Sequence, residues 1–180
     1  MDRKALIISN PGEVGEENYC DGVSVDVANY INYLTSPLGG AWYRSEIIHL
    51  DRPTSTEVDK QIKLLKGCDY AFIAFCGHGY YSFELKSTIL ILRKHIELDS
   101  LSLRSGANKR TIFLDCCRKI EKKPIRTLLV EKAERQIPEL NFTECRKYFN
   151  MEIERCSNGV VVGYACSVNE IAGDDPICGG

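Results

Sequence analysis

Residues 70–79 read YAFIAFCGHG, and residues 111–118 read TIFLDCCR. Each stretch is a short apolar run bounded by turn residues, which is typical of a strand buried on both faces of a sheet. The first stretch leads to His78 and the second leads to Cys117. Because reactive groups collect at the carboxyl ends of strands in an open parallel sheet, the two stretches predict an imidazole and a thiol at one sheet edge.

An imidazole beside a thiol is chemically useful, because a thiol with its ordinary pKa of ~8.5 is mostly protonated at neutral pH. A neighbouring histidine is the usual means of forming the reactive thiolate. Each residue also has a plainer interpretation: a tight turn favours the glycines around His78, and Cys116 and Cys117 fit as small apolar core residues. The shared strand-end position, with Asp115 two residues before Cys117, favours catalysis.

At these positions the chain resembles the caspase-like cysteine peptidases, which include caspases, metacaspases and bacterial relatives. In caspases the histidine lies about 50 residues before the cysteine, and the gap here is a little shorter. Caspases carry Gln-Ala-Cys-Arg-Gly or a close variant around the nucleophile, whereas residues 115–119 read DCCRK. This stretch is more similar to the Asp-x-Cys pattern of metacaspases. The resemblance therefore selects Cys117, rather than Cys116, as the nucleophile.

The resemblance implies a cysteine-type endopeptidase, a hydrolase acting on protein or peptide substrates. His78 is expected to serve as acid and base. The backbone N–H groups of Cys117 and Gly79 are expected to form the oxyanion site. No cofactor is evident in the sequence. Some metacaspases need calcium, and that analogy stays open here because no local motif decides it.

Two carboxylates are the candidate substrate-binding residues. Residues 21–28, DGVSVDVA, resemble the metacaspase segment Gly-Cys-x-Asn-Asp-Ala, with Val23 at the cysteine position. By this resemblance Asp26 and Asp115 line one specificity pocket, where two carboxylates attract an arginine or lysine side chain. Cleavage after basic residues is therefore expected. The plainer alternatives are a helix-dipole position for Asp26 and a structural cap or loop acceptor for Asp115.

Hydrophobic periodicity and turn signals along the chain predict strands that alternate with helices. Residues 81–97, which contain the apolar run 88–92, are expected to form a small hairpin, and residues 98–104 a short helix. The alternation predicts an α/β fold with a central parallel-rich sheet flanked by helices, and the resemblance implies a caspase-like sandwich. The expected strands are residues 4–9, 46–50, 70–75, 111–114 and 160–164, and helices are expected over 23–34, after a Thr54–Glu57 capping box and after Asn141 with Glu144.

The resemblance makes residues 1–180 one domain, a large-subunit-like portion with a linker-like insert at about 119–140. Residues 165–172, ACSVNEIA, resemble the segment after the fifth strand of metacaspase-like enzymes. A Gly-Gly pair commonly opens the sixth strand of the family, and here it is Gly179-Gly180. The chain is therefore expected to lack the last strand and helices of the fold. It is then a large fragment from processing, a truncation, or one half of a split protein that a small-subunit-like fragment or partner chain completes. Basic residues of the insert are candidate self-processing sites, with a solvated surface as the alternative: Lys122, Lys123, Arg126 and Arg135.

Composition limits the other classes of function. The chain has 180 residues, 44% hydrophobic and 27% charged, which suits one globular domain. A net charge of -2 disfavours nucleic-acid binding, and no apolar run approaches a membrane span. Nine cysteines are an odd number without zinc spacing, and the N-terminus lacks a signal-peptide pattern, so a cytoplasmic location is expected.

Three alternative functions follow from the same residues. A catalytically silent caspase-like module that binds or regulates a partner has the fold without turnover. A phosphatase loop needs an arginine six residues after its cysteine, and lysines occupy those positions here. A flavodoxin-like domain needs a glycine-rich phosphate loop after the first strand, which is absent from the sequence. The silent module is therefore the main competitor of the peptidase.

Overall fold

The computed structural model describes residues 1–118, 140–174 and 176–177. A five-stranded parallel sheet of order β2-β1-β3-β7-β8 forms the centre of the molecule. Its strands are β1 (Arg3–Asn10), β2 (Ile47–Asp51), β3 (Tyr70–Gly77), β7 (Lys109–Cys116) and β8 (Gly159–Tyr164). The α/β class and the parallel sheet predicted from the sequence are confirmed.

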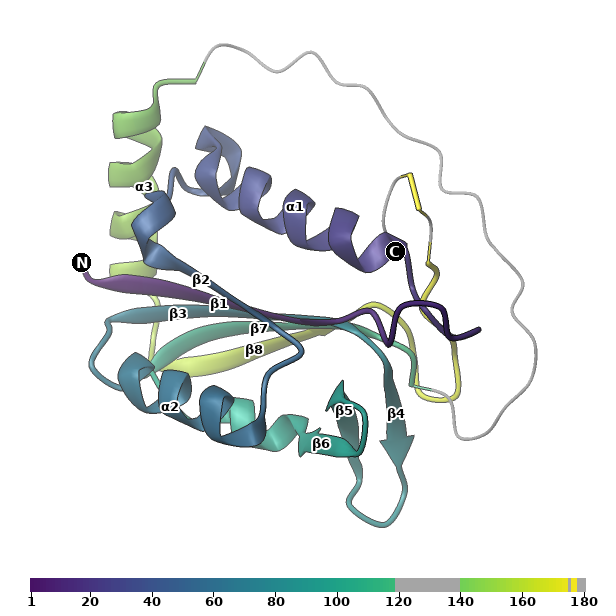
Figure 1. Cartoon of the computed structure of the whole chain (residues 1–180). Coiled ribbons are helices and arrows are strands. Elements are labelled where there is room, and N and C mark those ends of the chain that lie inside the picture. The colour runs from purple at the N-terminus through teal and green to yellow at the C-terminus, as the bar shows by residue number, and fades with distance from the viewer. Residues whose placement is uncertain (119–139, 175, 178–180) are drawn as a thin grey trace.

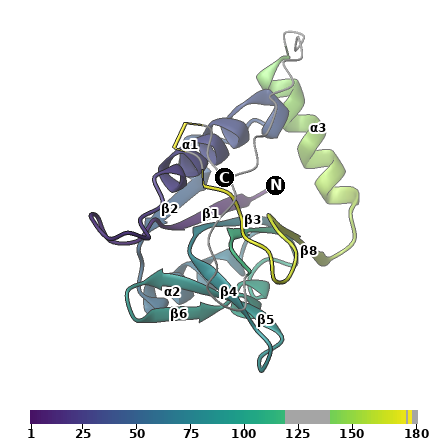
Figure 2. The same cartoon turned by 90° about the vertical axis from the view of Figure 1, so that its right-hand side faces the viewer.

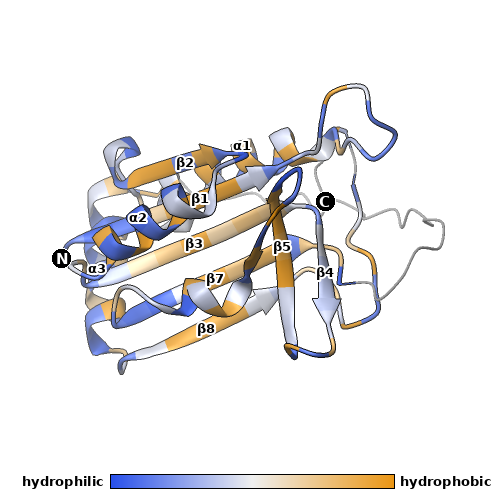
Figure 3. Cartoon of the chain, turned by 60° about the horizontal axis from the view of Figure 1, so that its bottom comes forward, coloured by the Kyte–Doolittle hydropathy of each residue, from blue (hydrophilic) through white to orange (hydrophobic). Residues whose placement is uncertain are grey.

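Helices cover both faces of this sheet, as Figures 1 and 2 show. On one face lie α1 (Gly22–Thr35) and α3 (Phe142–Arg155), and on the other lies α2 (Ser55–Leu65). The apolar strands between these layers account for much of the orange in Figure 3. Two buried clusters result: one includes Ile7 and Phe72 with Val27 of α1, and the other includes Leu6 and Ile73 with Ile62 of α2.

A second, antiparallel sheet lies on the α2 side, close to the carboxyl ends of the main strands (Figure 1). It has the order β4-β5-β6, with β4 (Gly79–Ser82), β5 (Ser87–Arg93) and β6 (Ile96–Asp99). The sequence predicted a hairpin here and a helix over 98–104. The structure contains one strand more than the predicted hairpin, because residues 96–99 pair with β5. In place of the predicted helix it has the shorter 3-10 turn Ser100–Arg104.

Helix starts follow the predicted capping chemistry. The Thr54 hydroxyl accepts a hydrogen bond from the Glu57 N–H, and the Glu57 carboxylate accepts one from the Thr54 N–H. The Asn141 side chain accepts from the Glu144 N–H at the start of α3. Such bonds satisfy amide donors that a helix cannot pair internally.

The insert at 119–139, with its four candidate processing residues, lies outside the described residues.

A buried arginine fixes α3 against the sheet. Arg3 of β1 is fully buried and lies over the Trp42 ring, with its Cζ 4.4 Å from the ring centroid. Glu46, in the 3-10 turn Arg44–Glu46, lies 3.8 Å from Arg3 and accepts a 2.6 Å hydrogen bond from Arg146 of α3.

A third turn, Pro37–Gly39, follows α1. In the described part of the chain, no helix combines the length and apolarity that a membrane crossing needs.

Candidate active site

His78 directly follows β3, and Cys117 directly follows β7. The two strands are neighbours, and Gly77 of β3 pairs in register with Cys116 of β7. Adjacent strands lie about 4.8 Å apart, so the residue after each of these partners begins at the same sheet edge. The structure thus places the residues directly before His78 and Cys117 as register partners at the carboxyl ends of neighbouring parallel strands.

The backbone before His78 is tightly constrained. Gly77 has a positive φ of 143°, and a Cβ at this position would lie 2.2 Å from the Asn10 carbonyl oxygen. The His78 carbonyl accepts a 3.0 Å hydrogen bond from the Ile91 N–H of β5. Glycine is therefore required at residue 77 for both conformation and space, and the strand end that carries the imidazole has little freedom.

Gly79 is also required by a close approach. A Cβ at Gly79 would lie 2.8 Å from the Cys116 Sγ and 2.9 Å from the Ile89 carbonyl oxygen. The β4 backbone consequently passes directly against Cys116. The glycines around His78 thus have a packing reason to be there, in addition to the oxyanion role expected for Gly79.

The two adjacent thiols lie in different environments. Cys116 is only 1% exposed, and burial raises the pKa of its thiol far above the ordinary value, with nearby Cys166 and Cys117 as further causes. Cys117 is half-buried, and its Sγ lies 3.8 Å from the Ala172 carbonyl oxygen. A buried thiol with a raised pKa is a poor nucleophile. The geometry therefore supports Cys117 as the reactive member of the pair.

A third thiol contacts the imidazole, and the sequence analysis missed it. The Cys20 Sγ lies 3.7 Å from His78 Nε2 and 3.9 Å from His78 Nδ1. Cys20 belongs to the loop between β1 and α1, and its N–H donates to the Pro11 carbonyl. The same loop passes close to the ring at Gly12, where a Cβ would lie 3.2 Å from His78 Nε2. Nothing in the spacing of residues 20 and 78 could have indicated this contact.

The two predicted pocket carboxylates interact electrostatically. Burial and the neighbouring charge of Asp26 raise the pKa of Asp115 from 3.8 to about 7. Asp26 is 8% exposed on α1, and Asp115 is half-buried near the end of β7. Burial, followed by Asp115 and Cys76, also raises the pKa of Tyr30 on the same helix. The structure thus brings Asp26 and Asp115 together between α1 and the sheet, beside the residues that follow β3 and β7.

Arg118, the residue after Cys117, holds the loop that follows β8. Its guanidinium lies over the Tyr164 ring, 3.9 Å from the centroid, and donates to the Thr88 hydroxyl and the Cys166 carbonyl. Its backbone N–H donates to the Glu170 carbonyl, and its carbonyl accepts from the Asn169 N–H. Arg118 therefore fixes the segment 165–170 next to Cys117.

Residues beyond this anchor cross the site toward α1, as the yellow segment of Figure 2 shows. The Ala172 carbonyl lies at the Cys117 thiol, and the Asp174 carboxylate accepts a 2.9 Å hydrogen bond from the Gly22 N–H. Gly22 opens α1, whose N-cap residue, Asp21, makes no side-chain capping bond. Asp174 therefore supplies an acceptor for this helix end. Segment 165–174 connects the thiol edge with α1.

Comparison with known proteins agrees with this arrangement of strands. A family model described as the caspase domain matches residues 2–180. The chain belongs to the caspase domain family. The solved structure of caspase-1 from Spodoptera frugiperda matches with a TM-score of 0.60 at 12% sequence identity, covering 99% of this chain and 64% of that chain. No match was found among the curated proteins.

At 12% identity the likeness to the insect caspase concerns the fold. The caspase-like sandwich expected from the sequence is thereby confirmed. This chain spans 64% of the length of the solved relative. The family is one of cysteine peptidases.

The caspase domain also carries a Ser-His-Asp group, which has the wrong arrangement for a second active site. The Ser9 hydroxyl lies 2.8 Å from His49 Nε2 and donates to the Asp51 carboxylate over 3.1 Å. In a catalytic triad the acid bonds to the histidine, whereas here the serine bonds to both partners. Ser9 is also only 2% exposed. The group ties β1 to β2.

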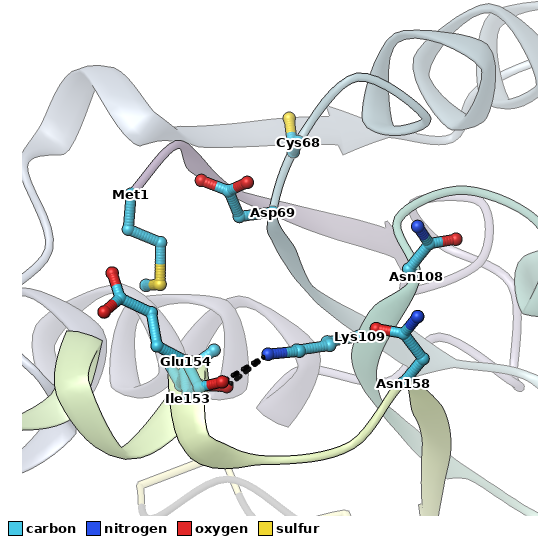
Figure 4. A pocket seen from close by; sticks show the side chains of 8 residues that line it. All are labelled: Met1, Cys68, Asp69, Asn108, Lys109, Ile153, Glu154 and Asn158. Atoms are coloured by element: carbon cyan, nitrogen blue, oxygen red, sulfur yellow. Dashed lines mark hydrogen bonds between the residues drawn. The ribbon is translucent and has the colours of Figure 1, made fainter.

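A cavity of about 310 Å³ lies at the opposite end of the sheet, where β3, β7 and β8 begin. Figure 4 shows Lys109 inside it, donating to the Ile153 and Glu154 carbonyls at the end of α3. These bonds add a donor to carbonyls of the last helical turn, where the Ile153 carbonyl also accepts from the Cys156 N–H. The cavity is therefore part of the α3 attachment and is remote from Cys117.

Within residues 1–118, 140–174 and 176–177, no three or more histidine, cysteine, aspartate or glutamate side chains are arranged to hold a metal ion. Asp26 and Asp115 form only a pair.

Proposed function

We propose that this caspase domain is a cysteine endopeptidase that uses Cys117 and His78 and cleaves after arginine or lysine. The observation that carries the proposal is the placement of a half-buried thiol and an imidazole after the paired ends of β7 and β3. The neighbouring thiol, Cys116, is buried. A strand-end thiol beside an imidazole is the arrangement that nucleophilic catalysis requires.

The reaction has two chemical stages. The Cys117 thiolate, formed by proton transfer to His78, attacks the substrate carbonyl, and the N–H groups of Cys117 and Gly79 stabilise the developing oxyanion. His78 then gives the proton to the leaving amine, which leaves a thioester on Cys117. Water, deprotonated by His78, hydrolyses the thioester and restores the thiol.

The preference for basic residues rests on Asp26 and Asp115. Burial is the main cause that raises the pKa of Asp115 to about 7, and the neighbouring charge of Asp26 adds to it. A cationic side chain between the two carboxylates would relieve their repulsion and favour the charged form of both. An aspartate side chain would add a third negative charge. The pair therefore favours arginine or lysine at the cleavage position.

An affinity label tests the proposal without turnover. A peptide fluoromethyl ketone ending in arginine should alkylate Cys117 after binding in the pocket, and mass spectrometry of the digested protein identifies the labelled residue. Labelling should exceed that by an otherwise identical aspartyl reagent by at least about tenfold. Cys166→Ala is the matched control, because it removes a nearby thiol and should leave labelling intact. Labelling of Cys116, or equal labelling by both reagents, would contradict the proposal.

A binding module without turnover is the second candidate, and one observation favours it. Segment 165–174 crosses the site and lies against the Cys117 thiol at Ala172. A substrate must displace this segment before its carbonyl reaches the sulfur. If the arginyl reagent fails to label Cys117 while the folded chain binds the matching unreactive peptide, the module is the better account.

The same proposal includes partners and processing. A small-subunit-like fragment or partner chain would complete the sheet beyond β8, the edge strand. Cleavage at Lys122, Lys123, Arg126 or Arg135 would be self-processing. Replacing all four with glutamine should then abolish the processing fragments of an active preparation.

A cytoplasmic location fits the eight free cysteines of the described residues, since free thiols persist in a reducing compartment.

A further inference from the structure

Four thiols gather where β7 ends. Cys116 and Cys117 lie on the strand end, and Cys166 follows β8, with its Sγ 3.4 Å from the Cys116 carbonyl oxygen. Cys20 approaches from the loop before α1 and contacts His78. Cys117 is among the charges that affect the titration of each of the other three. Such a cluster of thiols, in which Cys20, Cys117 and Cys166 are all partly exposed, is a candidate site of oxidation.

Cys20 is the member best placed to reach Cys117. It lies against His78, and His78 and Cys117 follow strand ends that pair at Gly77 and Cys116. Segment 165–174 also connects the surroundings of Cys117 with those of Cys20. Ala172 lies at the Cys117 sulfur, and Asp174, two residues on, bonds to Gly22, two residues from Cys20.

The other two thiols are held in place. Cys116 is 1% exposed beneath the Gly79 backbone, where even a Cβ would collide with its sulfur. The Cys166 thiol lies 3.4 Å from each of two carbonyl oxygens, those of Cys116 and Glu170. The Cys166 carbonyl is fixed in turn by Arg118. By contrast, the loop that carries Cys20 is exposed at residues 13–18 and borders solvent.

We propose that Cys20 is a resolving thiol that forms a reversible disulfide with Cys117 when peroxide oxidises Cys117. First, the Cys117 thiolate attacks one peroxide oxygen, giving Cys117 sulfenic acid and hydroxide, which takes up a proton to become water. Next, the Cys20 sulfur attacks the Cys117 sulfur and expels the hydroxyl group. His78 takes the Cys20 proton and passes it to that group, which leaves as a second water.

The order of these steps follows from the surroundings of Cys20. Burial, with the nearby charges of Asp174 and Cys117, raises the pKa of the Cys20 thiol to about 12. Peroxide reacts with thiolates, so Cys20 is disfavoured as the first thiol to be oxidised. In the proposed function Cys117 is the thiol that forms a thiolate, and this makes it the first target of peroxide. Cys20 then needs a base to attack, and His78 Nε2 lies 3.7 Å from its sulfur. The disulfide removes the nucleophile of the proposed peptidase and protects it from irreversible oxidation.

The experiment treats the full chain with hydrogen peroxide, blocks remaining thiols, digests the protein and maps disulfides by mass spectrometry. A peptide linking Cys20 to Cys117 is expected, and dithiothreitol should remove it. In Cys20→Ser the link should vanish, and the Cys117 sulfenic acid should accumulate at least threefold, as measured by dimedone trapping. In the matched control Cys166→Ser, the Cys20–Cys117 link should persist.

A link from Cys117 to Cys166 or Cys116, or dimedone trapping unchanged by Cys20→Ser, would overturn the inference. Disulfide mapping in the unmodified chain requires no variant to fold. The inference rests on the reactivity of Cys117 in the proposed function and not on peptide hydrolysis. A Cys20–Cys117 link in a chain that cleaves no peptide would sustain it while the peptidase proposal fails. A working peptidase whose oxidised Cys117 links to another thiol would give the converse result.

Discussion

Gly79 lies directly against Cys116, so closely that a Cβ on Gly79 would lie 2.8 Å from the Cys116 sulfur. The contact closes off one thiol of the Cys116–Cys117 pair at the sheet edge where β3 and β7 end. It also explains how two adjacent cysteines come to differ in chemistry: the β4 backbone buries the first, and the second remains half-buried after the strand end.

Gly79→Ala is expected to destabilise the protein by about 1–3 kcal/mol, because the added methyl group overpacks a site that cannot expand freely. Urea denaturation measures the change. Gly159→Ala is the matched control, since a Cβ there meets nothing within 4 Å, and its effect should stay below about 0.5 kcal/mol. Equal effects of the two substitutions would contradict the close contact.

Asp115 predicts a pH dependence of stability. Its folded-state pKa, about 7, lies above its ordinary value of 3.8, so the folded protein binds the proton more tightly than the unfolded chain. This stabilisation is complete below about pH 4 and is lost as the pH rises to about 7. The free energy of unfolding should fall by about 2–4 kcal/mol across this range.

Urea unfolding at pH 4, 5, 6 and 8 tests this dependence. Asp115→Asn should remove most of the slope, because the asparagine amide does not titrate in this range. Asp26→Asn should retain part of it, because burial is the larger cause of the Asp115 shift. An Asp115→Asn variant with the slope of the wild type would show that another group is responsible.

Arg118 is expected to stabilise the fold through its ring contact and its hydrogen bonds, and not through its charge alone. Arg118→Lys keeps the charge but loses the flat stacking on Tyr164 and the paired bonds to Thr88 and Cys166. A loss of about 1–2 kcal/mol in unfolding free energy is expected. The exposed pair of Arg155 with Glu152 provides the control, and Arg155→Lys should cost under about 0.5 kcal/mol. Indistinguishable losses would mean that the stacking contributes little.

Glu46→Gln tests the attachment of α3. Glu46 lies beside the fully buried Arg3 and accepts two hydrogen bonds from Arg146. Removing its charge leaves Arg3 without its nearest counter-charge, which should cost about 3 kcal/mol. Glu152 lies on α3 in an exposed ion pair, so Glu152→Gln should cost under about 0.5 kcal/mol. Thermal melting compares the two, and a small Glu46 effect would argue against this anchor.

The sequence predicted the main sheet well because its strands are apolar runs buried on both faces and bounded by turn residues. Tyr70–Gly77 and Lys109–Cys116 are examples, and the capping box at Thr54 marked the start of α2 in the same local way. The prediction of a helix over 98–104 was wrong at residues 98 and 99, because these residues belong to β6 and pair with β5.

The site was only partly readable from sequence. His78 and Cys117 follow strands whose ends could be recognised, and Asp26 and Asp115 came from a resemblance to metacaspases. Cys20 had no signal, because its contact with His78 depends on how the loop after β1 folds back over the sheet edge. The capping of α1 by Asp174 joins positions 152 residues apart and was equally invisible.

The most direct test of the account is peptide cleavage. Reporter peptides ending in arginine, lysine or aspartate should be compared for the wild type, Cys117→Ala and Cys116→Ala, both in this chain and in a longer chain that includes a small-subunit-like segment. The account predicts cleavage after arginine and lysine that falls by at least about a thousandfold in Cys117→Ala alone. Cleavage after aspartate, or loss in Cys116→Ala with activity retained in Cys117→Ala, would contradict it.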